Sequence, residues 1–178
     1  LPPWGNLEPA QLMMCYSRSQ DELPAWQAPD GFELRRYRSS DGDQVLALLR
    51  LVGFDFDTQR YQESLKRAEV QEGTHVVTYE GTVVGTAFAG RVDDNEGRID
   101  YVIANPEFGG NRIGYAVCEG VMRYLLGKGY KTVVLATDDW RLPAIVTYLN
   151  LGFAPLMHRE DMQKRWDAVQ ARLKLTRS

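Results

Sequence analysis

An apolar strand, a glycine-rich loop and an amphipathic helix follow one another directly in residues 102–114, VIANPEFGGNRIG. The strand is expected to end at Pro106 and the helix to begin near Ile113. Amide hydrogens at the start of a helix, with the helix dipole behind them, form a site for phosphate oxygens. Three glycines, Gly109, Gly110 and Gly114, let a ligand approach the backbone closely. We therefore predict that this loop binds a diphosphate group.

Two common phosphate-binding patterns do not fit this loop. A nucleotide-binding P-loop ends in Gly-Lys-Ser or Gly-Lys-Thr, and no such ending occurs in the chain. A dinucleotide-binding loop has the pattern G-x-G-x-x-G early in a βαβ unit, and Gly109, Gly110 and Gly114 do not have that spacing. The loop therefore points to another class of diphosphate ligand.

Length and composition predict one globular domain. The chain has 178 residues, of which 44% are hydrophobic, enough for one sizeable core. A net charge of −3 argues against a nucleic-acid or anionic-membrane partner. No apolar run is long enough to span a bilayer, and the sequence shows no signal-peptide pattern. The only cysteines, Cys15 and Cys118, are far apart, and His75 and His158 cannot alone build a metal site. We expect a cytoplasmic protein without disulfides or a metal.

The chain is expected to divide into an N-terminal arm, residues 1–30, and one domain, residues 31–178. Five prolines and several large apolar side chains in the arm, Trp26 among them, favour an extended segment that docks partly on the domain. The domain closes with an amphipathic helix over residues 160–174, in which Met162, Trp166, Val169 and Leu173 share one face.

Alternation and periodicity predict the other elements. Six strands are expected, at residues 32–37, 74–79, 82–89, 98–105, 131–137 and 153–158. The remaining helices are one capped by Ser40 or Asp41, one over residues 58–69, one over 113–127, and one that is capped by Asp138 or Asp139 and ends at Gly152. A strand–helix–strand crossover places two strands in parallel. We therefore expect an α/β domain with a mixed, mostly antiparallel sheet of six to seven strands and helices on both faces.

Two motifs in this order of elements resemble the GNAT superfamily of N-acetyltransferases. The loop 105–114 is similar to the family's proline step followed by Arg/Gln-x-x-Gly-x-Gly/Ala, with Gly109 in place of Arg or Gln and Arg112 in place of the central Gly. Residues 144–153, AIVTYLNLGF, resemble the family's Ala-Ile-x-x-Tyr-x-x-x-Gly-Phe signature, with Arg141 where an Asn usually opens it. The resemblance covers residues 32–159. It implies a splayed pair of parallel strands that holds acetyl-CoA as the cosubstrate.

The resemblance also implies where the coenzyme binds. The pantetheine chain would pair with main-chain groups of the strand before the loop, and the loop amides would hold the diphosphate. A further contact is expected from Arg141. Carried over by position, the coenzyme-binding residues are Val102, Ile103, Ala104, Gly109, Gly110, Asn111, Arg112, Ile113, Gly114 and Tyr115.

Two residues are candidates for proton transfer. The resemblance assigns Tyr148 as the general acid, because a phenol with a pKa near 10 stays protonated at neutral pH and can protonate a leaving thiolate. The alternative is a core tyrosine whose hydroxyl meets a backbone partner. Regular alternation puts Arg98, Asp100, Val102 and Ala104 on one face of their strand. Some members of the family carry a glutamate near the position of Arg98, and Asp100 is the nearest carboxylate on that face, so the resemblance makes it the candidate base. The alternatives are a solvated strand carboxylate or a structural partner of Arg98, with the amine losing its proton through ordered water.

Three functional hypotheses follow from these observations. The resemblance implies an enzyme that transfers an acetyl group from acetyl-CoA to a primary amine of a small molecule, with a homodimer as a possible assembly. Because the loop departs from the family pattern, a second hypothesis is a catalytically weak or inactive acyl-CoA-binding regulatory module. A third is a partner-docking protein that uses the aromatic arm and the helix face around Trp166.

Overall fold

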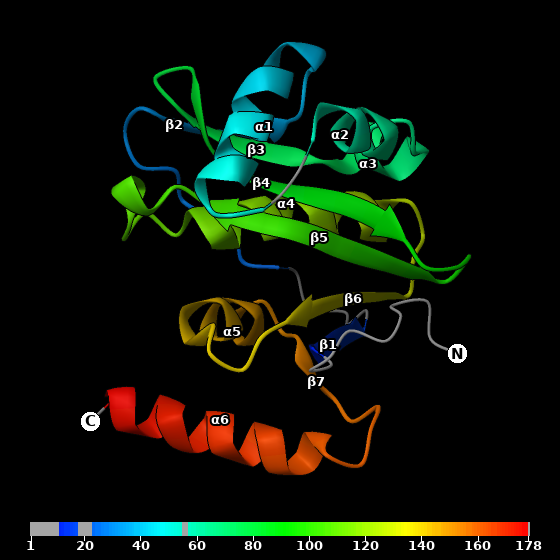
Figure 1. Ribbon diagram of the computed structural model, residues 1–178, viewed down its shortest axis with the longest axis vertical. Helices are drawn as coiled ribbons and strands as arrows, with labels where there is room; N and C mark the ends of the chain where they lie inside the picture. Colours follow the sequence, from blue (N-terminus) through cyan, green and yellow to red (C-terminus); the bar gives the residue numbers. More distant parts are fainter. Residues whose placement is uncertain (1–10, 18–22, 55–56, 178) are drawn as a thin grey trace.

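The computed structural model describes residues 11–17, 23–54 and 57–177. Its seven strands form one sheet in the order β2-β3-β4-β5-β6-β1-β7, in which only β5 and β6 are parallel (Figure 1). The strands are β1 Leu12–Ser17, β2 Phe32–Arg36, β3 His75–Tyr79, β4 Thr82–Arg91, β5 Glu96–Ala104, β6 Thr132–Thr137 and β7 Ala154–Leu156. The α-helices are α1 Gly42–Leu51, α2 Thr58–Ser64, α3 Ala68–Gly73, α4 Ile113–Gly127, α5 Leu142–Asn150 and α6 Met162–Arg177. The predicted mixed sheet is confirmed.

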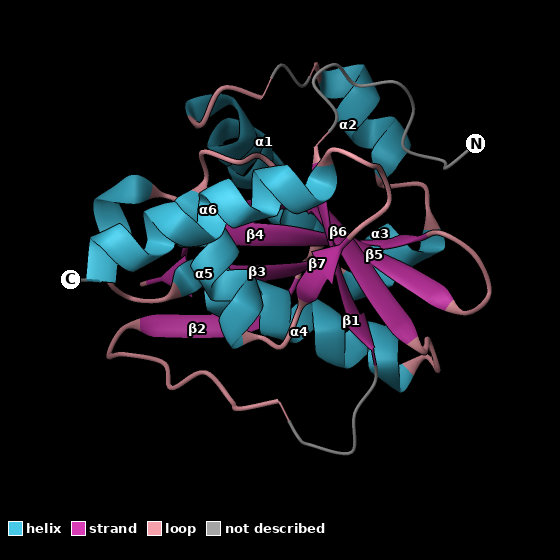
Figure 2. Cartoon of the chain, turned by 90° about the horizontal axis from the view of Figure 1, so that it is seen from below, coloured by secondary structure: helices cyan, strands magenta, loops and turns pink. Residues whose placement is uncertain are grey.

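Helices cover both faces of the half of the sheet that contains β2 to β5. In Figure 1, α1, α2 and α3 lie in front of β3 and β4, and α4 lies behind these strands. The side chains under α1–α3 form one apolar cluster, and those along α4 belong to a second, larger one. The other half of the sheet, β6, β1 and β7, lies beside α5 and α6, as Figure 2 shows from below. The boundary between the two halves is the β5–β6 pair.

Several local predictions are confirmed. The β3–β4 hairpin turns at Glu80 and Gly81, whose φ angles of 47° and 85° match the predicted tight turn. Helix α4 spans residues 113–127 as predicted. In α6, the four apolar residues of the predicted stripe are all buried, namely Met162, Trp166, Val169 and Leu173.

Strand β1 was not predicted, because the proline-rich surroundings favoured an extended arm. It lies between β6 and β7 and is antiparallel to both, with Met14 opposite Leu135 and Pro155. Leu12 and Met14 are fully buried. Strands from opposite ends of the chain, β1 and β7, therefore meet in the sheet, and β6 lies on the other side of β1.

Some predicted helix bounds and caps are wrong. Residues 58–69 form two short helices, α2 and the start of α3, although Asp57 does cap α2 by accepting a hydrogen bond from the Arg60 amide at 2.6 Å. Helix α5 begins at Leu142, with Arg141 as its cap and no capping bond from Asp138 or Asp139. Both carboxylates contact other side chains instead, since Asp139 pairs with Arg165 and Asp138 accepts from Gln11.

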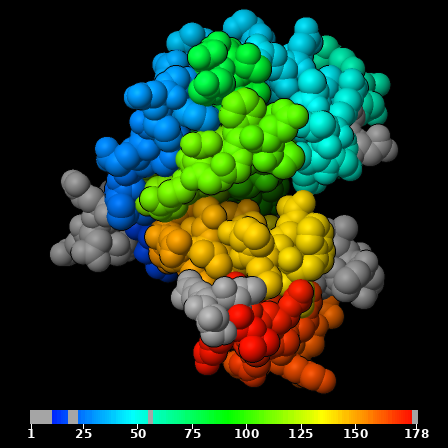
Figure 3. Space-filling view, turned by 90° about the vertical axis from the view of Figure 1, so that its left-hand side faces the viewer, coloured from blue at the N-terminus to red at the C-terminus, as the bar shows by residue number. Residues whose placement is uncertain are grey.

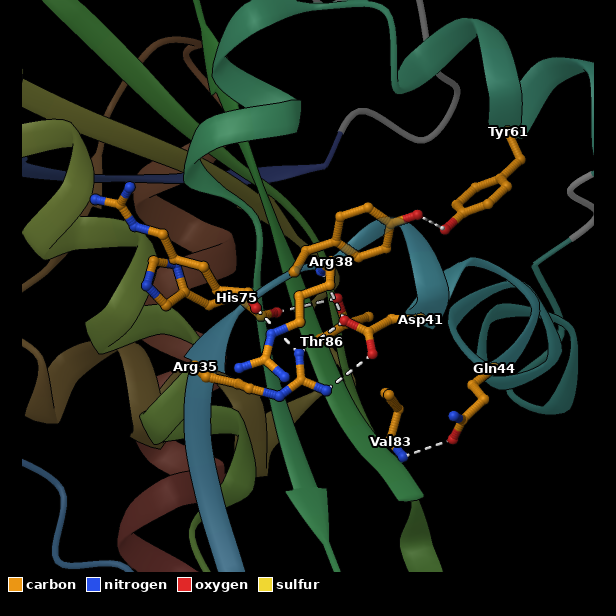
Figure 4. A network of polar contacts seen from close by, with 10 residues as sticks. Arg35, Arg38, Asp41, Gln44, Tyr61, His75, Val83 and Thr86 are labelled. Carbon is orange, nitrogen blue, oxygen red and sulfur yellow. Dashed lines mark hydrogen bonds and ion pairs between the residues drawn. The ribbon is translucent and has the colours of Figure 1, made fainter. Parts of the chain in front are cut away.

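Asp41 is the N-cap residue of α1, as predicted, but its side chain makes no capping hydrogen bond. The Asp41 side chain forms an ion pair with Arg35, in which both carboxylate oxygens accept from the guanidinium at 2.7 and 2.8 Å. The Arg38 amide donates to the same carboxylate at 2.7 Å. Figure 4 shows this network between β2, the start of α1 and the neighbouring strands. The side chain of Asp41 thus ties the start of the first helix to the sheet.

Candidate active site

The parallel strands β5 and β6 separate soon after they begin. They pair at only three positions, Glu96 with Thr132, Gly97 with Val133 and Arg98 with Val134. Beyond Arg98, strand β5 continues to Ala104 without a paired strand on its β6 side among the described residues. The edge of β5 at residues 102–104 therefore faces a cavity and not a neighbouring strand, as predicted for a splayed pair.

Two cavities occupy the space where the strands separate. The larger, about 520 Å³, is lined by the end of β5, the start of α5 and the segment after α1, with Val102, Ile103, Ala104 and Arg141 among its residues. The smaller, about 190 Å³, lies deeper between β5 and β6. Figure 3 shows the surface hollowed between the loop that follows β5 and helix α5. The predicted pantetheine-binding residues thus line a real cavity.

The glycine loop presents a row of free amides. Among the described residues, the N–H groups of residues 110–115 meet no protein acceptor. Arg112 caps α4 with φ 55° and ψ 34°, the left-handed conformation that glycine adopts most readily. A non-glycine residue held there costs about 1 kcal/mol. Arg112 therefore adopts a conformation that favours glycine, the residue that is usual at this position of the family pattern.

Arg112 has a defined position on the protein surface. Its guanidinium carbon lies 4.3 Å from the centre of the Tyr115 ring, one turn along α4. A guanidinium over an aromatic face is stabilised by the ring quadrupole. The cation is thus held beside the free amides, where it adds positive charge to the start of the helix.

Tyr148 is the predicted general acid. It lies on α5, is 4% exposed and lines the smaller cavity. Its hydroxyl has no hydrogen-bond partner among the described residues, in contrast to the expectation for a core tyrosine. Burial raises the pKa of Tyr148, and the nearby Arg141 cation opposes that rise. The phenol therefore stays protonated at neutral pH.

Asp100 lines the same cavity as Tyr148. It accepts a hydrogen bond from Arg98 Nε at 2.9 Å, and about a quarter of each side chain is exposed, 27% for Asp100 and 26% for Arg98. Burial raises the pKa of Asp100 although Arg98 acts in the opposite direction. A carboxylate with a raised pKa takes up a proton more readily than an ordinary aspartate.

The predicted alternation along β5 is wrong beyond Asp100. A bulge at Tyr101, where φ is 49°, shifts the register of β5 against β4. Asp100 pairs with Phe88, and Ile103 pairs with Thr86. One extra residue moves every later side chain to the opposite face. Ile103 therefore packs under α1–α3, the side on which Asp100 lies, and Val102 packs with the cluster along α4.

The cavities also contain residues that the sequence did not indicate. Gln11, just before β1, and Phe54, after α1, line the smaller cavity, and Phe54 lines the larger one as well. Gln11 donates to Asp138 Oδ1 at 3.2 Å. The five-residue apolar run after Gln11 is a signal for a buried strand, and it would have placed Gln11 near the site. Nothing in the sequence around Phe54 marks it.

Arg141 lines both cavities, and Tyr148 lines the smaller one with it. Its guanidinium carbon is 5.1 Å from the Trp140 ring centre, and its Nε is 3.6 Å from Asp138 Oδ2. Trp140 is 66% exposed at the mouth of the larger cavity. The site therefore has a cation and an exposed indole at its entrance.

The sequence comparison assigns the chain to a family. The model of the acetyltransferase (GNAT) family matches residues 20–153, more than half of the chain. The protein therefore belongs to the GNAT acetyltransferase family. It is also 26% identical over 160 residues to a mycothiol acetyltransferase of Saccharomonospora viridis, an alignment that covers 80% of this chain and 52% of that protein.

Solved structures share the fold. A GCN5-related N-acetyltransferase from Sphaerobacter thermophilus superposes with a TM-score of 0.70 at 18% identity, over 83% of this chain and 49% of that one. Rv2747 from Mycobacterium tuberculosis, solved in complex with CoA, gives a TM-score of 0.59 at 17% identity, over 78% of this chain and 81% of that one. The chain spans about half the length of the mycothiol and Sphaerobacter relatives. Every helix among the described residues is too short or too polar to cross a bilayer.

Proposed function

We propose that the protein is an N-acetyltransferase that transfers an acetyl group from acetyl-CoA to a primary amine of a small molecule. The observation that carries this proposal is the smaller cavity, because Asp100 and Tyr148 both line it at the point where β5 and β6 separate. Family membership supports the same reaction class. A cytoplasmic location and a homodimer stay predictions.

The residues present fit a coenzyme A cosubstrate. The free amides of residues 110–115 and the Arg112 cation suit a diphosphate. The larger cavity is lined by Val102, Ile103, Ala104 and Arg141 and is mostly apolar, which suits the methylene and methyl groups of the pantetheine chain, while the edge of β5 offers main-chain partners for its amides. The departures at Gly109 and Arg112 leave the free amides in place, which favours a functional coenzyme site over a regulatory module that has lost its ligand.

The proposed reaction uses Asp100 as the base in its first step and Tyr148 as the acid in its second. The amine nitrogen attacks the thioester carbonyl carbon, and Asp100 takes the proton that the nitrogen loses. The carbon–sulfur bond then breaks, and the Tyr148 hydroxyl gives its proton to the departing thiolate. Burial raises the pKa of Tyr148, and the Arg141 cation opposes that rise, which favours the release of the proton.

The Tyr148→Phe variant tests this assignment. We expect kcat to fall about 100-fold, because the phenol is the only acid assigned to the thiolate, while the Kd for acetyl-CoA stays within about twofold of the wild-type value. Thiol release with acetyl-CoA and a panel of small primary amines measures turnover, and calorimetry measures Kd. Longer acyl-CoA donors in the same assay test the preference for acetyl.

Tyr130→Phe is the matched control, because Tyr130 is also buried and its hydroxyl donates to Glu69 outside both cavities. Unchanged turnover in Tyr148→Phe would remove Tyr148 from the reaction. Binding of acetyl-CoA without amine-dependent thiol release in the wild-type protein would favour the regulatory module, and absence of binding would exclude both functions.

A further inference from the structure

Residues 23–26, which we call the strap, lie along α4 and reach the glycine loop. Three contacts fix the strap to the helix. Arg123 donates to the Leu23 carbonyl at 2.8 Å, the Tyr115 hydroxyl donates to the Pro24 carbonyl at 2.7 Å, and the Trp26 amide donates to Glu119 at 2.6 Å. In a fourth contact, Trp26 Nε1 donates to the carbonyl of Asn111 at 3.0 Å. The strap thus connects a segment about 85 positions away to the predicted diphosphate loop.

The fourth contact determines where one loop amide points. In a trans peptide the carbonyl and the following N–H point in opposite directions. The Asn111 carbonyl is directed at the indole, so the Arg112 N–H is directed away from it. That N–H is one of the free amides of residues 110–115. The indole N–H therefore fixes the orientation of a phosphate donor without touching the phosphate.

The same contact holds an unfavourable backbone conformation. Arg112 adopts φ 55°, which a non-glycine residue rarely keeps without support from its surroundings. Trp26 is 9% exposed, so its hydrogen bond to the preceding carbonyl is largely shielded from water. Stacking of Arg112 on Tyr115 acts in the same direction, and the Tyr115 hydroxyl is itself held by the strap.

We propose that Trp26 is a positioning residue for the diphosphate of coenzyme A, acting through the Asn111–Arg112 peptide. This inference rests on the proposed coenzyme-binding function of the loop. The group that matters is the indole N–H, and the rest of the side chain fills space against α4. Removing the N–H alone therefore weakens the binding of ligands that contain the diphosphate and does not change the binding of ligands that lack it.

Trp26→Phe removes the N–H and keeps an aromatic ring. Turnover is compared between acetyl-CoA and acetyl-pantetheine, which lacks the diphosphate and the nucleotide. We expect KM for acetyl-CoA to rise about five- to tenfold, the effect of one hydrogen bond, with kcat at saturation unchanged. The kcat/KM for acetyl-pantetheine stays at its wild-type value. A purely structural role for Trp26 would lower both kcat/KM values together.

Trp166→Phe is the matched control, because Trp166 is also buried, lines neither cavity, and has an indole N–H without a hydrogen-bond partner among the described residues. An equal loss for both donors in Trp26→Phe, or the same selective loss in Trp166→Phe, would overturn the inference. If wild-type protein turns over acetyl-CoA and Trp26→Phe keeps the wild-type ratio of the two donors, only the inference fails. If wild-type protein binds no acetyl-CoA, the proposed function fails with it.

A measurement on the wild-type protein covers the case in which Trp26→Phe does not fold. The Trp26 indole ¹H–¹⁵N resonance is followed by NMR during titration with CoA and with pantetheine. We expect it to shift with CoA, because phosphate binding at the Arg112 amide polarises the peptide whose carbonyl the indole contacts. Pantetheine should leave it in place. An indole resonance that is unmoved by saturating CoA would overturn the inference.

Discussion

The Arg35–Asp41 and Arg98–Asp100 pairs join the same two side-chain types in different surroundings. Asp41 is nearly enclosed, with 4% of its side chain exposed, and its two oxygens accept from Arg35 and from the Arg38 amide (Figure 4). These donors hold the pKa of Asp41 below its usual value. Among the described residues, Asp100 accepts one hydrogen bond, from Arg98. It lies on a cavity wall, and burial raises its pKa.

Burial raises the pKa of Asp100, whereas hydrogen-bond donors lower that of Asp41, and this accounts for the difference between the two pairs. A carboxylate that accepts several hydrogen bonds in its charged form is stabilised as an anion and takes up a proton less readily. A carboxylate with one partner in a partly desolvated site keeps an oxygen free and takes up a proton more readily. The first arrangement serves stability and the second suits a general base.

Asp41→Asn is expected to cause the largest loss of stability. The substitution leaves the buried Arg35 cation without its counter-charge, and breaking a buried pair costs about 3 kcal/mol. The free energy of unfolding, measured with urea, should fall by that amount. Asp43→Asn, at an exposed position in the first turn of α1, is the control and should change it little. A loss below about 1 kcal/mol in Asp41→Asn would contradict the structural role.

Asp100→Asn should have a large effect on turnover and a small one on stability. If Asp100 accepts the proton of the amine, kcat should fall about 100-fold, equivalent to about 2.7 kcal/mol of barrier. The free energy of unfolding should stay within about 1 kcal/mol of the wild-type value, because Arg98 remains partly solvated. Asp94→Asn, in the exposed turn between β4 and β5, is the control. If kcat of Asp100→Asn equalled that of the wild-type protein, the base would be another group.

The sequence predicts only part of the difference in surroundings between Asp41 and Asp100. Local signals were sufficient for the β3–β4 turn and α4, because glycines and apolar periodicity act over a few residues. The resemblance to a known family added the topology and placed Tyr148 in the site. The β5 bulge at Tyr101 has no such signal, and it decides which face Asp100 shares with its neighbours.

Long-range contacts account for the other differences between prediction and structure. Strand β1 pairs with strands more than a hundred residues later, and no local pattern names those partners. The Trp26 contact with Asn111 joins the chain over a similar distance. The sequence marked the loop as a phosphate site, but it did not reveal which side chain orients the loop.

The pH dependence of stability gives the smallest and sharpest test of the contrast. The pKa of Asp41 is lowered, so its stabilising contribution is complete above the ordinary aspartate pKa of about 3.9 and is lost as pH falls through the folded-state value. The pKa of Asp100 is raised, so its charged form destabilises the fold at neutral pH. That cost disappears as pH falls through the raised value towards about 3.9.

Urea unfolding of wild-type protein, Asp41→Asn and Asp100→Asn from acidic to neutral pH measures both effects. The stability advantage of wild type over Asp41→Asn should shrink below about pH 3.9. The stability of wild type relative to Asp100→Asn should instead increase as pH falls towards about 3.9 from above. On acidification, the stability of wild type relative to Asp100→Asn thus rises above about pH 3.9, whereas its stability relative to Asp41→Asn falls below that pH. If both shrank together on acidification, Asp100 would be a second structural anion, and its role as the base would lose its electrostatic support.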